Sequence, residues 1–434
     1  MARAATAIDG SWSLAAWRNW SGSVVAAPSA IEHPRSEAEL QSLVAAAAKV
    51  RVVGTGHSFM PLCATDGLML SLAELEGELE IADDGRSAWV PAGMPIGVLT
   101  AALWAKGFSL INQGDIDKQA IAGAVSTATH GTGHALGSLA TAAEAFRLVL
   151  ADGSVVDCDR TREPELFEAA RVSLGMLGVI VRIRMKVLPA YRLEERLRRE
   201  SFNRTRTEWD NIAGSHRHAE FFQFPYADDV LIKTLDVVES GDSPPPGALE
   251  DTVLQLVCDL AAAWPGSAPT MQRLLTGAIG SSRRAGRAGR IFPSQRAVRF
   301  EEMEYEIPAE NGLDAFARAV ALVREKRWPI IFPLEFRTVA ADDIWLSPMH
   351  GRACASISFH QYAKMDWREA FDAMERLFAE AGGRPHWAKR HTLTSADVVR
   401  LYPPAERWGA VRKRVDPTGK FLNEHLAQLF AFSL

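Results

Sequence analysis

A short glycine-rich turn followed by a histidine is the first stretch of this sequence that could carry chemistry. An apolar run at residues 50–53 leads into GTGHS. Glycines in such a turn allow a close approach to a phosphate and present backbone N–H groups to it. A neutral imidazole nitrogen is a competent nucleophile, and a rigid turn would hold it against a bound ring. Taken alone, GxG is weak evidence, and a histidine after a turn is more often a capping or surface residue. The candidate residues are Gly54, Thr55, Gly56, His57 and Ser58.

A second segment, residues 114–133, combines glycines with small hydroxyl side chains. Such a surface could bring many N–H donors and short hydroxyls against a pyrophosphate and a flat ring. The alternative is a glycine-rich connection between strands. The candidates are Gly114, Gly123, Ser126, Thr127, Thr129, His130, Gly131 and Gly133.

Glu335 and Arg337 form a third candidate set. They are two residues apart in PLEFR, so on a strand both side chains point to one face. A carboxylate beside a guanidinium can accept and donate hydrogen bonds to neighbouring hydroxyls, as a polyol or a lactone requires. The alternative is a cross-strand ion pair on the surface. His360 lies on another predicted strand and could remove a hydroxyl proton in its neutral form.

Regular elements on both sides of these residues would hold them in place. The pattern predicts helices over residues 36–49, 95–107, 164–176 and 366–381, and strands over 50–53 and 178–188. FRLVLADGSVVDC predicts a hairpin with Asp152-Gly153 as a two-residue turn. Strands and helices occur in both halves without a regular βαβ alternation, which favours an α+β fold. The composition changes near residue 190, where we place a domain boundary.

The composition is that of an ordinary folded protein. The 434 residues are 47% hydrophobic and 23% charged, and a chain of this length is expected to form two or three domains. The net charge of −5 gives no basic footprint, so no nucleic-acid partner is predicted. The densest positive stretch, residues 283–299, carries six arginines. We interpret it as a solvated loop, with an anion-binding or lipid-surface patch as the alternative.

Cysteine usage and hydropathy indicate the compartment. Cys63, Cys158, Cys258 and Cys354 lie far apart, so neither a disulfide framework nor a zinc site is expected, and no metal is predicted. Residues 1–17 have no apolar core followed by a cleavage site, and no window of about 18 apolar residues exists. We therefore expect a cytoplasmic protein without an integral membrane segment.

The first two segments, in this order and spacing, resemble the FAD-binding domain of the vanillyl-alcohol oxidase superfamily. In that superfamily the histidine of the GxGHS loop is often joined covalently to the flavin 8α position. Residues 164–180 fit the same domain, which commonly has a glycine-rich turn, here Gly175 to Gly178, whose backbone meets the flavin. The resemblance implies FAD, covalently bound through His57, and adds Gly178 and Ile180 to the cofactor-binding residues. No cysteine lies between Cys63 and Cys158, so a second covalent tether is not expected.

Nearly the whole chain, from about residue 17 to 428, is similar to the aldonolactone and alditol oxidase family, which includes L-gulonolactone, D-arabinonolactone, alditol and xylitol oxidases. The resemblance rests on NWSG at residues 19–22, PLEFR, SFHQY, RPHWAK and DPTGKFLN. It implies a two-subdomain FAD-binding domain at 1–190, a substrate-binding cap domain at 191–400 built on an antiparallel sheet with flanking helices, and a C-terminal segment at 401–434 that returns to the FAD domain. The resemblance also implies that Asn423, the last residue of DPTGKFLN, is a cofactor-binding residue.

The implied reaction is FAD-dependent oxidation of a sugar-derived alcohol, first of all an aldono-1,4-lactone such as L-gulono-1,4-lactone. Glu335 and Arg337 would orient the hydroxyls, His360 would take the O–H proton, and hydride would pass to flavin N5. Lys389 would stabilise the anionic reduced ring. His386 is the alternative base, although its HWAK context favours a structural role.

Several alternatives stay open at this point. The substrate could be an alditol, and the electron acceptor could be O2 or another carrier. Two further alternatives belong to other classes of protein. The first is a non-catalytic flavin-binding protein. The second is a nicotinamide-linked enzyme, but this sequence lacks the GxGxxG fingerprint in a βαβ unit that such enzymes carry. Residues 195–325 resemble nothing that we recognise.

Overall fold

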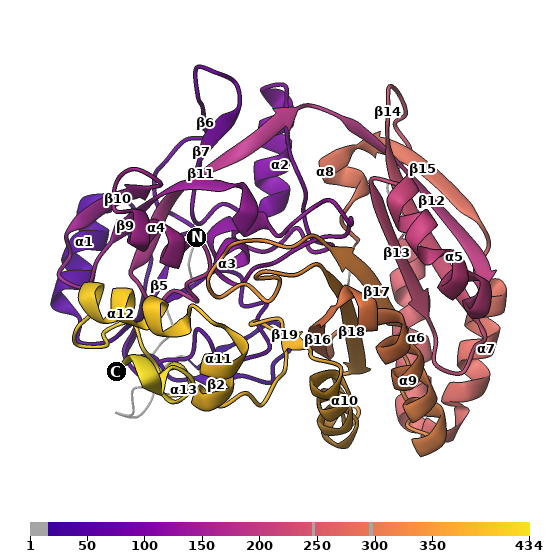
Figure 1. The fold of residues 1–434 in the computed structure, drawn as a ribbon. Helices are drawn as coiled ribbons and strands as arrows, with labels where there is room; N and C mark the ends of the chain where they lie inside the picture. Colours follow the sequence, from indigo (N-terminus) through magenta and orange to yellow (C-terminus); the bar gives the residue numbers. More distant parts are fainter. Residues whose placement is uncertain (1–15, 245–247, 295–297) are drawn as a thin grey trace, which may run out of the picture.

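Two α+β modules lie side by side in the computed structural model, which describes residues 16–244, 248–294 and 298–434 (Figure 1). One module is formed by the first part of the chain together with the C-terminal helices, and the other by the middle of the chain. The prediction that the N-terminal residues 1–17 are not a signal peptide falls mostly on residues 1–15, which lie outside the described residues.

The first module contains a small parallel sheet, a larger antiparallel one and a two-stranded antiparallel sheet formed by β1 and β2. The parallel sheet has the order β3-β5-β4, and the larger antiparallel sheet has the order β10-β9-β11-β7-β6, with β8 paired to β11. The strands are β1 (Trp17–Arg18), β2 (Val25–Ala26), β3 (Ala30–Glu32), β4 (Val50–Val53), β5 (Leu68–Ser71), β6 (Glu80–Ile81), β7 (Ser87–Pro91), β8 (Phe108–Leu110), β9 (Ala143–Val149), β10 (Val155–Asp159) and β11 (Val179–Pro189). The helices are α1 (Glu37–Ala46), α2 (Ile96–Ala105), α3 (Ile121–Ser126) and α4 (Pro164–Ala170).

The second module is an eight-stranded antiparallel sheet with the order β15-β12-β14-β13-β17-β18-β16-β19. Its strands are β12 (Arg192–Ser201), β13 (His218–Gln223), β14 (Asp229–Val238), β15 (Ser282–Arg287), β16 (Phe300–Pro308), β17 (Leu334–Val339), β18 (Cys354–Tyr362) and β19 (Arg384–Pro385). Its helices are α5 (Phe202–Ser215), α6 (Ala248–Ala263), α7 (Ala268–Ala278), α8 (Ala288–Ile291), α9 (Ala309–Lys326) and α10 (Arg368–Glu380).

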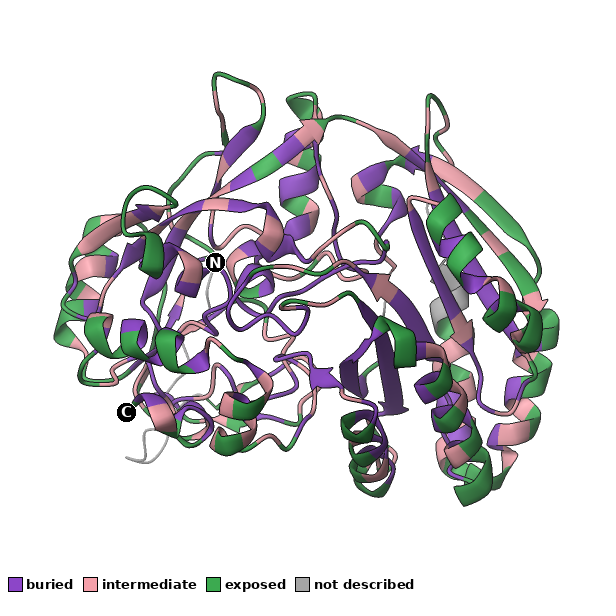
Figure 2. Cartoon of the chain, in the orientation of Figure 1, coloured by how far each residue is buried: buried purple, intermediate pink, exposed green. Residues whose placement is uncertain are grey.

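The two faces of the eight-stranded sheet differ because side chains alternate along each strand. Phe221, Phe336 and Ile357 lie on the apolar face, which α5, α9 and α10 cover. Figure 2 shows these strands buried and the outward sides of α9 and α10 exposed. The other face is charged and buried, and its residues form the site described below.

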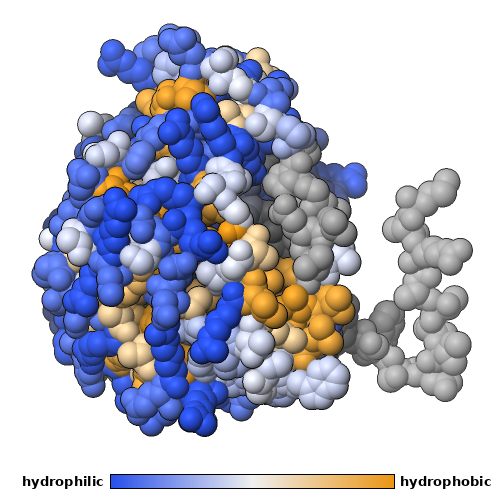
Figure 3. Space-filling view, turned by 90° about the vertical axis from the view of Figure 1, so that its right-hand side faces the viewer, coloured by the Kyte–Doolittle hydropathy of each residue, from blue (hydrophilic) through white to orange (hydrophobic). Residues whose placement is uncertain are grey.

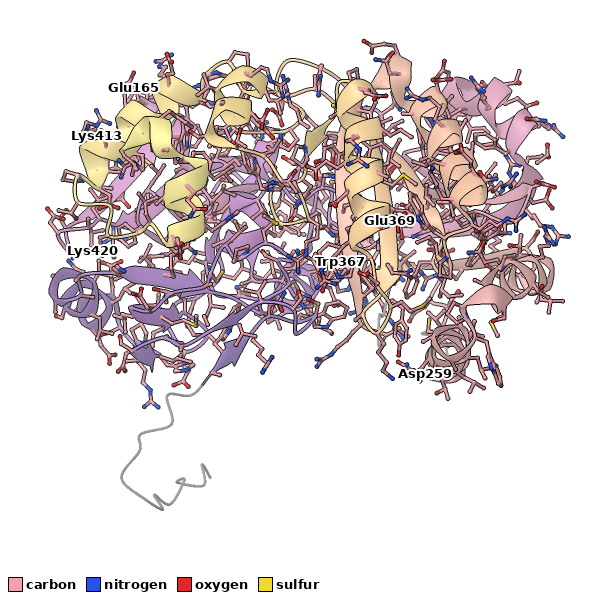
Figure 4. The ribbon with its side chains drawn as sticks, turned by 90° about the horizontal axis from the view of Figure 1, so that it is seen from below. Glu165, Asp259, Trp367, Glu369, Lys413 and Lys420 are labelled. Carbon is pink, nitrogen blue, oxygen red and sulfur yellow. The ribbon has the colours of Figure 1, made fainter. Side chains whose placement is uncertain are left out.

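The C-terminal helices α11 (Ser395–Leu401), α12 (Ala405–Val415) and α13 (Glu424–Leu429) return to the first module. Their apolar residues belong to the same core as α1, β4 and β11. Val50 N donates to Lys420 O at 2.9 Å, and the ammonium of Lys420 donates to Val44 O at 2.6 Å at the end of α1 (Figure 4). The chain end therefore helps to hold the strand that precedes the GTGHS turn.

Most predicted elements are confirmed, with three corrections. The helix predicted over 164–176 ends at Ala170, and it could not reach residue 176, because Leu174 and Gly175 adopt positive φ values of 51° and 68°. The hairpin has a three-residue loop, since Leu150 N donates to Ser154 O and Gly153 takes φ 86°. The arginine-rich stretch read as a solvated loop includes β15 and α8.

The outer end of the second module carries α5 to α7. Figure 3 views the molecule from this side and shows mostly hydrophilic side chains with smaller apolar areas. Leu256 on α6 and Leu274 on α7 are among the exposed apolar residues. Within the described residues, no helix combines the length and the apolar character that crossing a membrane requires.

Candidate functional site

A cavity of about 470 Å³ opens between the parallel sheet and the larger antiparallel sheet of the first module, and we call it the glycine-lined cavity. The segments that line it are 51–58, 71–77, 91–98, 119–127 and 174–180, in part, together with Ala388. The predicted residues found there are Gly54, Thr55, Gly56, His57, Ser58, Gly123, Ser126, Thr127, Gly178 and Ile180. None of the described lining residues is a carboxylate, so nothing in the lining would repel a diphosphate. The cavity therefore fits the dinucleotide part of FAD.

The GTGHS turn requires its glycines for steric reasons. A Cβ at Gly54 would lie 2.9 Å from Cβ of Ala120, and Gly56 adopts φ 70°. The NWSG segment braces the turn from outside, because Trp20 N donates to Gly56 O at 2.8 Å and Asn19 Nδ2 donates to Ser58 O at 3.0 Å. The turn is thus a rigid backbone surface that side chains do not obstruct.

His57 is held in its neutral form at the mouth of this cavity. Burial, and then the positive charge of Lys389, lower the pKa of His57 to about 4. The ring of Trp20 lies 5.4 Å from the His57 ring between centroids. A neutral imidazole keeps the nitrogen lone pair that bond formation to a flavin methyl carbon requires.

Arg51, which the sequence did not single out, ties the cavity walls together. Its guanidinium is buried and donates to the carbonyl oxygens of Leu62 at 2.9 Å, Gly175 at 3.0 Å and Leu174 at 2.7 Å. It also donates to Phe421 O at 2.5 Å. One side chain on β4 therefore joins the loop after GTGHS, the Gly175 turn and the C-terminal segment.

The polar side of the eight-stranded sheet carries a buried group of charges, which we call the charged face. Register places Glu335 opposite Ser358, Arg337 opposite Ser356 and Glu220, and Glu302 opposite His360. Loop residues Asp115 and His130 and the segment of Lys389 close over these strands. The charged face comprises Asp115, His130, Glu220, Lys233, Glu302, Glu304, Glu306, Glu335, Arg337, His360 and Lys389.

Arg337 is the centre of the charged face. Its Nε donates to Glu220 Oε2 at 2.9 Å, and Nη2 donates to Asp115 Oδ2 at 3.0 Å and to Glu335. Lys233 lies 2.7 Å from Glu220 on the other side. The predicted Glu335–Arg337 pair therefore exists, but it is buried and part of a network rather than an exposed cross-strand pair.

Glu302 connects the other two predicted catalytic residues. Lys389 donates to its carboxylate, and His360 Nε2 lies 3.2 Å from its Oε1. Burial alone would raise the pKa of Glu302, but Lys389 and His360 outweigh burial and lower the pKa to about 2. Phe59 N donates to Ala388 O at 2.7 Å, which fixes Lys389 beside the GTGHS turn.

His130 belongs to the charged face rather than to the glycine-lined cavity. Its Nδ1 lies 2.8 Å from Gly131 O, and its Nε2 lies 3.1 Å from Glu306 and 3.3 Å from Glu304. Burial would lower the pKa of His130, but Glu306 and Glu304 raise it to about 10. These three side chains could also supply ligand atoms to a metal ion. With a proton on each nitrogen, the imidazolium uses the carboxylates as hydrogen-bond acceptors.

Five other predicted residues lie away from the cavity lining. Thr129 hydrogen-bonds Thr127 through the hydroxyls at 3.3 Å, and Gly133 N donates to Thr338 O at 2.8 Å. Gly114 and Gly131 pack closely, since a Cβ at Gly131 would lie 2.2 Å from Gln113 O. Asn423 caps α13 and donates to the carbonyls of Pro61 and Ala64, so its place is structural.

Sequence reasoning missed several members of the charged face. Asp115, Glu220, Lys233 and three of the four glutamates of β16 were not among the candidates. FEEMEYEIP contained a usable signal, because Glu302, Glu304 and Glu306 alternate with apolar residues at strand spacing. Burial of all three was not predictable from that pattern alone. His386 is buried, its pKa is lowered to about 3 by burial, and its Nδ1 accepts from Ala388 N at 3.1 Å.

Comparison with known proteins gives a consistent family. A model described as D-arabinono-1,4-lactone oxidase matches residues 183–429, and one described as an FAD binding domain matches residues 28–159. L-gulono-1,4-lactone dehydrogenase of Mycobacterium tuberculosis is 41% identical over 420 residues, which cover 94% of this chain and 97% of that protein. L-gulonolactone oxidase of Bos taurus and alditol oxidase of a Streptomyces species are each 28% identical, over 95% of this chain and 98% of their own.

The fold has solved counterparts. A variant of cholesterol oxidase from Brevibacterium sterolicum superposes with a TM-score of 0.82 at 15% identity, and the match covers 96% of each chain. At this identity the likeness concerns the fold alone. The likeness and the match to an FAD binding domain over residues 28–159 together confirm the predicted α+β fold with its FAD-binding domain.

Proposed function

The chain belongs to the D-arabinono-1,4-lactone oxidase family and is an FAD-linked oxidoreductase that acts on an alcohol group, and we propose that its substrate is an aldono-1,4-lactone, first of all L-gulono-1,4-lactone. The name of the 41% identical relative supports this choice of lactone. The observation that carries the proposal is the charge of the face that surrounds Arg337.

The charged face suits a neutral polyhydroxylated molecule. It has six carboxylates, from Asp115, Glu220, Glu302, Glu304, Glu306 and Glu335, against the cations of Lys233, Arg337, Lys389 and His130. Carboxylates accept hydrogen bonds from hydroxyls, whereas they repel a carboxylate-bearing substrate. A lactone has hydroxyls and no charge. The aldonate formed by its hydrolysis has the same kind of hydroxyls but carries a carboxylate, which this face would repel.

We propose roles for four residues on this basis. Glu335 and Arg337 orient the substrate hydroxyls, and His360 receives the O–H proton with Glu302 beside it to stabilise the resulting imidazolium. Lys389 supplies a fixed positive charge next to the GTGHS turn. Bound FAD supplies the two-electron acceptor for the hydride of the alcohol carbon.

The cofactor-binding residues proposed are those that line the glycine-lined cavity. Their backbone N–H groups and short hydroxyls would hold the diphosphate, and neutral His57 would form the covalent bond to the ring. We expect His57→Ala to leave no acid-stable flavin, because the nucleophilic nitrogen is gone. The measurement is absorbance of the acid-precipitated protein. Acid-stable flavin in the variant would show that another residue forms the bond.

The test of function is anaerobic titration of the purified flavoprotein with L-gulono-1,4-lactone and with xylitol, followed by absorbance. We expect the lactone to bleach the oxidised flavin at lower concentration than xylitol. Bleaching by xylitol alone would make the chain an alditol-oxidising enzyme. A flavin that neither compound bleaches would contradict the proposal. Admission of air after bleaching would show whether O2 serves as acceptor.

A further inference from the structure

A second cavity, of about 660 Å³, lies between α2 of the first module and the β15–α8 segment of the second. It adjoins the glycine-lined cavity at His57, which lines both. We call it the arginine-rimmed cavity, after Arg284, Arg287 and Arg290 in its wall. The proposed roles of the charged face do not use it.

The lining of this cavity is aromatic and cationic. Trp20 and Trp104 supply flat apolar surface, and the guanidinium of Arg287 lies 5.0 Å from the Trp104 ring. Among the described lining residues, Lys118 and the three arginines face a single carboxylate, that of Asp117. Arg284 is paired with Glu195 at 2.7 Å, but Arg287 has no carboxylate within ion-pair distance among the described residues. The rim therefore has positive charge to offer an incoming anion.

One buried polar group in the wall also lacks a partner. The side-chain nitrogen Nε2 of Gln113 is buried without a hydrogen-bond partner among the described residues. Burying an amide donor without an acceptor is unfavourable, and buried polar groups are normally satisfied. Because this nitrogen is shielded from solvent, an acceptor oxygen in the cavity would reach it only if the Gln113 side chain turned toward the cavity.

The loop that contains Gln113 separates two sites of opposite charge. Asp115 belongs to the charged face through its 3.0 Å bond with Arg337, while Gln113, Ile116 and Lys118 line the arginine-rimmed cavity. The carboxylate-rich site suits a neutral hydroxylated donor. The cationic site, which His57 also lines, suits a different and negatively charged molecule.

We propose that the arginine-rimmed cavity binds the electron acceptor of the reaction, and that this acceptor is a flat quinone-class molecule with a negative charge. The proposal rests on the proposed function, because it needs a reduced flavin at His57. The quinone takes two electrons and the N5 proton from the reduced flavin and one proton from water. Hydroquinone forms and the oxidised flavin returns, so that atoms and electrons balance.

The test uses the flavin-loaded full chain and 2,6-dichlorophenolindophenol, a flat quinone-imine dye that is anionic at neutral pH. The variant is Arg287→Glu. The matched control is Arg283→Glu, on the same strand β15, which reverses the same charge but does not line the cavity. Equilibrium dialysis gives the dissociation constant of the dye for the oxidised protein, and anaerobic stopped-flow absorbance follows flavin reduction by lactone and reoxidation by dye separately.

We expect Arg287→Glu to weaken dye binding by about tenfold and to slow reoxidation at low dye concentration, whereas Arg283→Glu changes both by less than about twofold. Flavin reduction by the lactone should be the same in all three proteins. Equal weakening by both variants, or a wild-type protein that does not bind the dye, would overturn the proposal. So would slower reduction by lactone in Arg287→Glu, which would make the cavity the donor route. If lactone fails to reduce the wild-type flavin, the proposed function fails, and the binding measurement still decides on the cavity.

Discussion

His57 and His130 lie in the same region but hold opposite charge states because of what surrounds each ring. His57 is buried next to a cation, so its pKa falls to about 4, while His130 faces two carboxylates and its pKa rises to about 10. The first can act as a nucleophile at neutral pH. The second is a fixed cation that holds Glu304 and Glu306 together.

We expect His130→Gln to lower the free energy of unfolding by about 3 kcal/mol at neutral pH, since it removes the cation paired with buried Glu306 and one of the three cations near buried Glu304. The folded-state pKa lies above the ordinary value of 6.5, so the His130 contribution is complete below about pH 6.5, declines as pH rises and is lost above about pH 10. The difference between wild type and variant should therefore shrink toward alkaline pH. Urea unfolding at a series of pH values measures it.

The control for that prediction is His216→Gln, which removes a half-exposed histidine paired with Asp236 at 2.6 Å. A pair of this exposure should contribute less than about 1 kcal/mol. If both variants lost the same free energy of unfolding, burial of His130 and its carboxylates would not explain the contribution of His130 to stability.

Glu335→Gln tests the orienting role of the carboxylate. The amide keeps the shape but loses the negative charge, so we expect kcat with lactone to fall by about 10²-fold while the flavin spectrum stays as in wild type. Glu301→Gln is the matched control, because Glu301 is a neighbouring buried glutamate that pairs with Arg390 outside the charged face. Steady-state kinetics with a saturating acceptor measure kcat in both variants. An unchanged kcat in Glu335→Gln would show that Glu335 does not orient the substrate.

At the scale of elements, the flavin site depends on how β4 is joined to its neighbours. Arg51 makes hydrogen bonds to carbonyls from three separate segments. Its guanidinium can do so because it carries several N–H donors that point in different directions, which a lysine ammonium at a single point cannot match. Burial lowers the pKa of Arg51 to about 10, so it stays charged at neutral pH.

We expect Arg51→Lys to lower stability by about 2 kcal/mol and to weaken FAD retention, because one ammonium cannot reach all these carbonyls. Thermal unfolding and the flavin-to-protein absorbance ratio are the measurements. Arg35→Lys, at an exposed arginine paired with Glu74, is the control and should change neither. Retention of FAD at the wild-type ratio in Arg51→Lys would show that the Gly175 turn holds its shape without this brace.

At the scale of the whole molecule, the first module is completed by residues more than 350 positions away. Asp416 is fully buried and accepts hydrogen bonds from Lys420 N at 2.8 Å and Phe421 N at 2.9 Å, which shapes the turn whose carbonyls reach Val50 and Arg51. Arg407 of α12 also pairs with Glu165 of α4 at 3.0 Å, and Figure 4 labels Glu165 in this region.

We therefore expect Asp416→Ala to destabilise the protein by about 2 kcal/mol and to lower FAD content, although Asp416 lies far from the flavin cavity in sequence. Thermal unfolding and FAD content after purification measure the two effects. Asp366→Ala, at an exposed aspartate before α10, is the control. Loss of stability with normal FAD content would mean that the C-terminal turn supports the core without shaping the cavity.

The sequence by itself determined the local features. Ser36 caps α1 by accepting from Glu39 N, the strand over 179–189 forms, and Gly56 gives the GTGHS turn the positive φ that glycine adopts without strain. Glu335 and Arg337 share a face because strand geometry has a period of two. These features depend on neighbours within a few residues, and the domain bounds drawn from the same pattern stay a prediction.

Only the tertiary structure decided which charges meet. Asp115, Glu220 and Arg337 come from segments about a hundred residues apart, and no spacing in the sequence indicates that they are in contact. The helix after Pro164 cannot extend through Leu174 and Gly175, which form a turn whose carbonyls Arg51 binds. The arginine-rich stretch forms a strand because β12 is there to pair with it. Burial and long-range pairing set charge state and conformation, and both are properties of the folded chain rather than of any local pattern.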